Sequence, residues 1–299
     1  MHFGFLNVMK PPGMTSHDVV ARVRRLTKIK RSGHGGTLDP LAEGVLPMAL
    51  GQACRLIDYL PSEKTYYAEI LLGKKTTTDD LEGDVVEENT ADHITEEQIE
   101  KALSQFRGQI KQHPPVYSAI RIDGQRLYDL ARKGQAPAQA PERTVTVHSL
   151  EVVSIKVPIV AIRVHCSKGT YIRSLARDLG DALGTGGCLF KLVREKAGFM
   201  NLENSLSLER IKDLTENNDW QPLFTDLTDA LGFRKVEIEE SDADRIFNGR
   251  NIDIEHSKNG ESGRFLLAVK NGKYLALLKH VDEKNWKPEV VFSDARVSS

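Results

Sequence analysis

The sequence is poor in cysteine, has no long apolar run and shows no signal for export. Its three cysteines, Cys54, Cys166 and Cys188, are too few and too far apart for a disulfide framework, which indicates a reducing compartment. No run approaches the about 18 apolar residues that a membrane-spanning helix needs. The N-terminus also lacks the charged and apolar blocks of a signal peptide. We therefore expect a soluble, cytoplasmic protein with no membrane segment.

Motifs for metal or phosphate binding are also missing. The nine histidines are scattered, and none has the spacing of a His-x-x-x-His site or joins a cysteine cluster. The glycine-rich segment 33–47 fits neither the G-x-G-x-x-G pattern nor the G-x-x-x-x-G-K-[ST] phosphate loop. We therefore expect no metal site.

Charge is balanced over the chain but segregated along it. The 41 Lys and Arg residues oppose 42 Asp and Glu residues, for a net charge of −1. Residues 10–31 nevertheless hold seven basic side chains and one acid, whereas residues 79–100 hold ten acids and no Lys or Arg. A basic surface on a neutral protein suits a polyanion such as RNA. A solvated helix face explains the same pattern, so charge alone leaves both interpretations open.

The length of 299 residues favours one large domain followed by a small one. Thr15 and Asp18 form an imperfect capping box before apolar residues at helical spacing, which predicts a helix there. A second capping box at 94–98 predicts another helix, which Gly108 ends. The acidic segment 76–90 is typical of turns. We expect further helices at 171–183 and 206–214, an apolar core segment at 45–60, and strands at 3–8, 65–72, 144–155, 159–166 and 189–199.

Two later segments differ in character. Residues 111–142 hold four prolines, two tyrosines and several basic side chains, which suggests a long functional loop with a short helix at 125–133. An ordinary linker explains the composition equally well. Beyond a boundary near residue 231, the pattern predicts a small β-rich module. Its expected elements are a helix at 241–247 and strands at 236–238, 264–269 and 274–280, the last two joined by the hairpin signal Asn271-Gly272.

The segment 33–47 sets a single aspartate in a constrained backbone. Glycines precede Asp39 and let a ligand approach closely, and Pro40 disfavours the helical region for Asp39. A carboxylate held this way beside His34 can act as a base, an electrostatic stabiliser or a nucleophile. Glu43 is the only other acid nearby in the sequence, so a hydrolytic carboxylate pair is not indicated. A glycine-rich turn with a capping aspartate is the alternative.

Several separated motifs resemble those of the tRNA pseudouridine synthase B family. The segment 33–47 is similar to the family's catalytic motif G-H-x-G-x-L-D-P-x-A-x-G-x-L. The matches follow the family's order and cover about the first 200 residues. The other matching motifs are Lys10-Pro-x-Gly13-x-Thr-Ser16, Lys64-Thr-Tyr66, and Ser167-Lys-Gly-Thr-Tyr171-Ile-Arg173 with the Leu192-x-Arg194 element that follows.

The resemblance implies a role for each of seven residues. Asp39 is the expected nucleophile. Arg173 is expected to pair with it, and because a helix dipole disfavours a cation near the helix start, a specific acidic partner is the more plausible. Tyr66 is expected to stack on the target base. Tyr171 and Leu192 are expected to line the pocket, and His34 and Lys10 to support the site or hold the flipped RNA.

The resemblance also implies the fold and the reaction. The expected fold class is α+β, with a mixed, largely antiparallel sheet and flanking helices in a catalytic domain of residues 1–230, and a PUA-like RNA-binding module at 231–299. The loop at 111–142 resembles a thumb that grips RNA. The implied reaction isomerises a uridine in the T-loop of tRNA to pseudouridine without a cofactor, in a monomer that flips out the target base.

The sequence departs from the family's pattern at Gly35, Glu43, Val193 and Glu195, none of which is a presumed catalytic group. Two other functions stay open. One is a tRNA-binding or RNA-folding protein without catalysis, which substitution of Asp39 would distinguish. The other is an Asp-dependent glycosyl-transfer enzyme for small nucleosides, which a comparison of a free nucleoside with a T-loop hairpin would distinguish.

Overall fold

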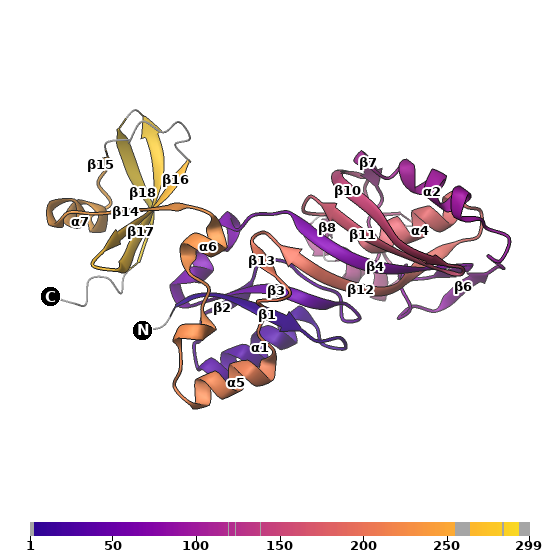
Figure 1. Cartoon of the computed structure of the whole chain (residues 1–299), viewed down its shortest axis with the longest axis horizontal. Coiled ribbons are helices and arrows are strands. Elements are labelled where there is room, and N and C mark those ends of the chain that lie inside the picture. The colour runs from indigo at the N-terminus through magenta and orange to yellow at the C-terminus, as the bar shows by residue number, and fades with distance from the viewer. Residues whose placement is uncertain are drawn as a thin grey trace.

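The computed structural model describes residues 3–118, 120–122, 124–137, 139–254, 264–282 and 284–292. A nine-stranded sheet forms the larger part of the molecule (Figure 1). Its strands lie in the order β1 (Gly4–Lys10), β3 (Glu43–Leu50), β12 (Gly187–Ala197), β4 (Lys64–Leu72), β11 (Ile159–Cys166), β10 (Arg143–Lys156) and β7 (Gly108–Gln112), with β2 (Ser32–His34) paired to β3 and β13 (Met200–Asn201) to β12.

One junction in this sheet differs from all the others. β3 and β12 run parallel and pair Glu43 with Val193 and Gly44 with Arg194, whereas the other strand pairs of the sheet are antiparallel. Gly44 has a φ of +109°, and a Cβ at this position would lie 2.4 Å from the carbonyl oxygen of Arg194. Only glycine fits here. The prediction of an α+β fold with a mixed, largely antiparallel sheet is confirmed.

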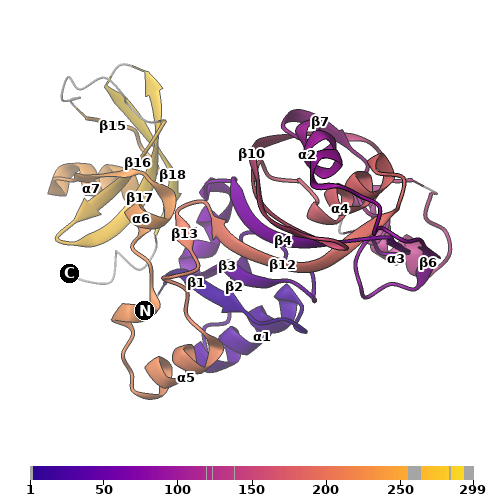
Figure 2. The same cartoon turned by 45° about the vertical axis from the view of Figure 1, so that its right-hand side comes forward.

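Helices cover the sheet at both ends (Figures 1 and 2). α1 (Ser16–Thr27) and α5 (Leu208–Glu216) lie together beside the N-terminal strands, and the predicted capping box of α1 is complete. α2 (Glu96–Ser104) and α4 (Ile172–Ala182) lie together at the other end. None of the helices in the described part of the chain is long and apolar enough to cross a bilayer.

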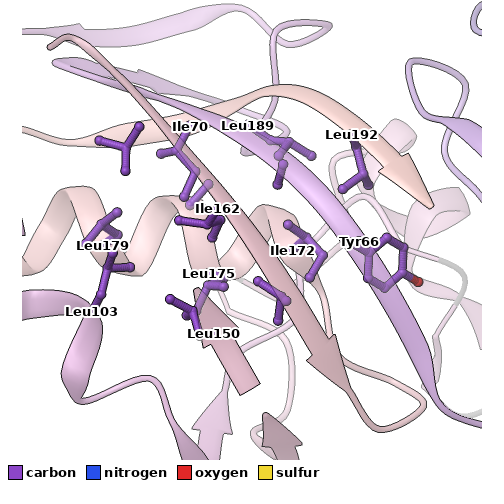
Figure 3. Close-up of a cluster of buried hydrophobic side chains, with 14 of the residues drawn as sticks. Tyr66, Ile70, Leu103, Leu150, Ile162, Ile172, Leu175, Leu179, Leu189 and Leu192 are labelled. Atoms are coloured by element: carbon purple, nitrogen blue, oxygen red, sulfur yellow. The ribbon is translucent and has the colours of Figure 1, made fainter. Parts of the chain in front are cut away.

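The largest hydrophobic core lies between α4 and the strands β4, β11 and β12 (Figure 3). Leu175 and Leu179 of α4 face Ile70 and Ile162 of the sheet, and all four are fully buried. The alternation of buried residues along β4 follows from the two-residue period of a strand. Tyr66 lies at one end of this core, with its hydroxyl directed away from the aliphatic side chains (Figure 3).

Two sequence predictions need correction. Gly108 does not end α2, which stops at Ser104; Gly108 instead opens β7 with a φ of +80°. The segment 76–90 is not merely turns, because β5 (Lys74–Thr76) and β6 (Val85–Glu88) form a hairpin. Asp80 between these strands is 2% exposed, and a buried acid cannot be recognised from an acidic composition alone.

The loop at 111–142 has its own structure. β8 (Arg121–Ile122) pairs with β9 (Gln125–Arg126), and α3 (Leu127–Arg132) follows within the range predicted for a short helix. A small apolar cluster of Ile120, Leu127 and Ala140 closes it. This segment is therefore a folded excursion from the sheet, and not an extended linker.

The C-terminal region forms a separate five-stranded sheet. Its order is β14 (Arg234–Glu237), β16 (Phe265–Lys270), β17 (Lys273–Asp282), β18 (Asn285–Val291) and β15 (Ile252–Asp253), with α7 (Glu240–Phe247) beside it. The predicted hairpin at Asn271-Gly272 joins β16 to β17. β15 and β18 were not predicted. Residues 255–263 and 293–299 of the predicted module lie outside the described residues.

The two sheets share a hydrophobic cluster through η1 (Gly51–Tyr59), a 3₁₀ helix after β3. The rings of Tyr59 and Phe265 meet edge to face with centroids 5.1 Å apart. The Nη1 of Arg55 donates a hydrogen bond to the carbonyl of Val291 at 2.7 Å. The short elements η2 (Gln221–Leu223) and α6 (Leu227–Leu231) lead from α5 into the C-terminal sheet.

Candidate active site

The backbone of residues 36–40 is fixed by side chains from distant elements. Arg194 is fully buried on β12 and donates hydrogen bonds to the carbonyls of Gly36 at 3.0 Å, Thr37 at 3.3 Å and Val45 at 2.6 Å. A buried carbonyl without a donor destabilises the fold by about 1–3 kcal/mol. One guanidinium therefore satisfies three carbonyls, two of them in the loop that carries Asp39.

The rest of this loop is satisfied from the N-terminal side. The hydroxyl of Ser16 donates to the carbonyl of Leu38 at 3.0 Å and accepts the amide N–H of Leu38 at 2.8 Å. Lys10 is fully buried, and its ammonium donates to the carbonyl of Pro40 at 3.2 Å. The N–H of Ala42 bonds the carbonyl of Asp39 at 3.1 Å. Every carbonyl from residue 36 to residue 40 thus has a donor.

Asp39 extends from this loop toward Arg173, the first basic residue of α4. The Arg173 Nε lies 2.9 Å from the Asp39 Oδ2, and the two side chains are 6% and 33% exposed. The arginine also donates to the carbonyls of Thr78 at 3.0 Å and Tyr117 at 3.1 Å. The carboxylate is therefore partly exposed to solvent, whereas its cationic partner is buried and fixed by hydrogen bonds to two backbone carbonyls.

Asp80 is a second carboxylate at the same arginine. Its Oδ2 lies 3.4 Å from the Arg173 Nη1, and its other oxygen accepts bonds from the Thr78 hydroxyl and the amide of Glu82. Burial raises the pKa of Asp80 above its ordinary value. Sequence reasoning missed this residue and found only Glu43 near Asp39, because Asp80 is 41 positions away in the chain.

Arg177 repeats the pattern one helical turn after Arg173. Its Nη1 lies 2.8 Å from the Asp79 Oδ2, and its Nη2 donates to the carbonyl of His113 at 2.9 Å. Asp79 has a φ of +61°, an uncommon conformation for a residue with a side chain. α4 therefore binds both the β5–β6 hairpin and the start of the 111–142 loop, and sequence reasoning did not identify this second clamp.

A pocket of about 560 Å³ opens beside Asp39. Six of the seven residues singled out from the sequence line it, and Lys10, which lies under the loop with no exposed surface, does not. Tyr66 and Leu192 come from neighbouring strands and are 7% and 5% exposed. The six that line the pocket are His34, Asp39, Tyr66, Tyr171, Arg173 and Leu192.

Two tyrosines and a histidine that line the pocket have shifted pKa values. Burial raises the pKa values of the Tyr66 and Tyr171 phenols, so both stay protonated at neutral pH. Burial and the nearby Arg194 lower the pKa of His34, whose Nδ1 accepts the N–H of Gly36 at 3.3 Å. No three His, Cys, Asp or Glu side chains among the described residues are arranged to hold a metal ion.

Comparison with known proteins agrees with this geometry. A family model for the N-terminal domain of TruB family pseudouridylate synthases matches residues 24–172. A tRNA pseudouridine synthase B of Dehalococcoides mccartyi is 42% identical over 293 residues, which cover 97% of this chain and 96% of the relative. The chain belongs to the TruB family of pseudouridylate synthases. The resemblance seen in the sequence motifs is confirmed.

Other relatives extend the match. A tRNA pseudouridine synthase B of Acaryochloris marina is 51% identical over 223 residues, or 74% of this chain and 77% of that protein. Among solved structures, an H/ACA ribonucleoprotein bound to a substrate RNA containing 2′-deoxyuridine has a TM-score of 0.70 at 26% identity. That match covers 97% of this chain and 85% of the other. The structural likeness therefore includes the C-terminal sheet.

Proposed function

We propose that this pseudouridylate synthase converts uridine 55 in the T-loop of tRNA to pseudouridine, with Asp39 as its nucleophile. The observation that carries the proposal is the Asp39–Arg173 ion pair, in which a one-third exposed carboxylate at a pocket wall is oriented by a buried guanidinium 2.9 Å away. A carboxylate so oriented can form a covalent intermediate without a metal or cofactor.

The reaction rearranges one nucleotide without changing its composition. The bond between C1′ and N1 breaks, the bond between C1′ and C5 forms, C5 loses its proton to solvent, and N1 gains one. Asp39 engages the nucleotide while the base detaches and turns. Tyr66 stacks on the base, as aromatic side chains do with unpaired RNA bases, and Leu192 and Tyr171 bound the pocket.

The RNA substrate must expose its uridine, because a stacked base cannot enter a pocket. The exposed basic residues of α1 and the loop that follows, the folded 111–142 thumb and the C-terminal sheet are the surfaces that we assign to the tRNA T-arm. We assign residues 1–230 to catalysis and residues 231–299 to a PUA-like RNA-binding module. The enzyme would act as a monomer in the cytoplasm.

Tritium release tests the proposal directly. Unmodified tRNA labelled with tritium at uracil C5 should lose label from one uridine when incubated with the enzyme, and Asp39→Asn should abolish the release while tRNA binding is kept. A free nucleoside should not react. Unchanged release by Asp39→Asn would remove Asp39 from the nucleophile's role, and tight binding without release by the wild type would favour an RNA-binding protein.

A further inference from the structure

Lys64 lines the pocket but has no part in the proposed reaction. It opens β4 two residues before Tyr66, and since side chains alternate along a strand, both lie on the same face of β4. Both line the pocket. The Nζ of Lys64 donates to the carbonyl of Ser62 at 2.9 Å. An ammonium has three donors, so this single bond leaves capacity for a ligand.

The surroundings of Lys64 are those of a cation without a counter-charge. The described residues place no carboxylate within ion-pair distance of its Nζ, whereas Arg194 and Lys168 add positive charge nearby. Burial and these cations lower the pKa of Lys64 to about 8. An anion entering the pocket would relieve this repulsion and favour the charged ammonium.

The turn before α4 brings further groups to the pocket that suit a phosphate. Ser167, Lys168 and Thr170 line it, and all three belong to the turn before α4. The Ser167 hydroxyl accepts the N–H of Thr146 and keeps its own proton for a ligand, whereas the Thr170 hydroxyl donates to the carbonyl of Ser167. Hydroxyl and ammonium donors are the groups that bind phosphate oxygens in RNA complexes. The side chain of Lys64 lies over Gly36, where a Cβ would come within 3.4 Å of the Lys64 Cε.

We propose that Lys64 binds a backbone phosphate of the RNA at the nucleotide that enters the pocket, through a charge-assisted hydrogen bond. The inference rests on the proposed function, because it requires an RNA nucleotide in this pocket. It gives the Lys-x-Tyr spacing a physical meaning. One face of β4 then holds both the base, at Tyr66, and a phosphate adjoining the same nucleotide, at Lys64.

The test combines two substitutions, one in the protein and one in the RNA. T-arm hairpins are made with the ordinary target uridine, or with a neutral methylphosphonate at its 5′ or its 3′ linkage. Binding of each hairpin is measured for the wild type, for Lys64→Ala, and for a charge-matched control, Lys101→Ala, which removes an exposed lysine of α2 that does not line the pocket.

One neutral linkage should weaken binding to the wild type by about tenfold, as expected for a lost charge-assisted bond. Lys64→Ala should bind the ordinary hairpin about tenfold more weakly and show no further loss at that linkage, while Lys101→Ala should behave as the wild type does. Lys64→Arg should keep the discrimination. Such coupling would not arise if Lys64 only stabilised the fold.

Several outcomes would overturn the inference. Equal losses at both linkages in the wild type and in Lys64→Ala would show that Lys64 contacts neither phosphate. If Lys64→Ala has a lower single-turnover rate at saturating RNA but binds the hairpin as the wild type does, Lys64 would be assigned to proton transfer instead. Tritium release by the wild type from the ordinary hairpin is measured in parallel, so that failure of the proposed function is separated from failure of this inference.

Discussion

Arg173 brings together three segments that are far apart in the chain. Its guanidinium contacts Asp39 in the loop of residues 36–40, Thr78 and Asp80 in the β5–β6 hairpin, and Tyr117 in the 111–142 loop. Asp39 and Asp80 both lie within ion-pair distance of this almost completely buried arginine, so removal of Arg173 would take their shared cation from both carboxylates. The orientation of Asp39 thus depends on segments far from it in the sequence.

Lys10 gives a prediction about pH. Burial lowers the pKa of its ammonium to about 8 from an ordinary value of 10.5, with Asp39 opposing the shift. Between these values the unfolded chain binds more protons at this group than the folded chain, so the group makes the free energy of unfolding rise with pH. Lys10→Met should show a smaller rise than the wild type over this interval, as measured by urea unfolding.

The control for this measurement is Lys101→Met, because Lys101 is exposed. Its free energy of unfolding should follow the pH dependence of the wild type. Parallel curves for Lys10→Met and the wild type would contradict the prediction.

Single residues were predictable where a local rule pointed to them. Arg173 at a helix start is electrostatically unusual, which called for a partner such as Asp39, and the two lie 2.9 Å apart. Asp79 and Asp80 gave no such signal, because ten acids within 22 residues look like a solvated surface. Only the hairpin geometry turns these two inward, toward Arg173 and Arg177.

At the scale of elements, the parallel contact of β3 with β12 joins the two halves of the sheet at Gly44. Gly44→Ala places a Cβ 2.4 Å from the carbonyl oxygen of Arg194 in a backbone conformation with φ of +109°. The strand pair would have to separate, so we expect a loss of several kcal/mol of stability or no folded protein. Chemical denaturation measures the loss.

Gly184→Ala is the matched control, because Gly184 also has a positive φ, of +72°, but nothing within 4 Å of its added Cβ. It should lose only about 1–2 kcal/mol, the strain of the left-handed conformation. Similar losses in the two variants would show that the strand junction tolerates a side chain.

Elements were predictable in proportion to the locality of their signals. Capping boxes at Thr15 and Thr95 predicted the starts of α1 and α2, and the hairpin signal predicted the turn between β16 and β17. The strand order was not predictable from the residues themselves, because β12 inserts between β3 and β4 from about 140 positions away in the chain. The family resemblance predicted a mixed, largely antiparallel sheet but gave no strand order.

At the scale of the molecule, the two sheets should unfold together because they share the cluster around η1. In Trp220→Phe the remaining tryptophan is Trp286, which is fully buried in the C-terminal sheet and reports its unfolding. Circular dichroism reports the helices, most of which cover the larger sheet. We expect the two signals to have the same midpoint.

Phe265→Ala in that background should lower the free energy of unfolding by about 2 kcal/mol, because it removes a half-buried ring. Both midpoints should therefore fall together. A shift of the fluorescence midpoint alone would show that the C-terminal sheet unfolds independently. The sequence predicted two modules but not their shared core, since Tyr59 and Phe265 are separated by 206 positions and neither has a local reason to find the other.

The carbonyl groups of residues 36–40 all accept hydrogen bonds, and this has a consequence for kinetics. Because the carbonyls of this loop already accept hydrogen bonds from the protein, the loop does not need to change conformation when RNA binds. We therefore expect the slower rearrangement to occur in the nucleic acid, which must open its own loop to release a base. The turnover rate of the enzyme should then follow the rate at which the RNA loop opens. A tRNA whose loop opens more easily should be modified faster.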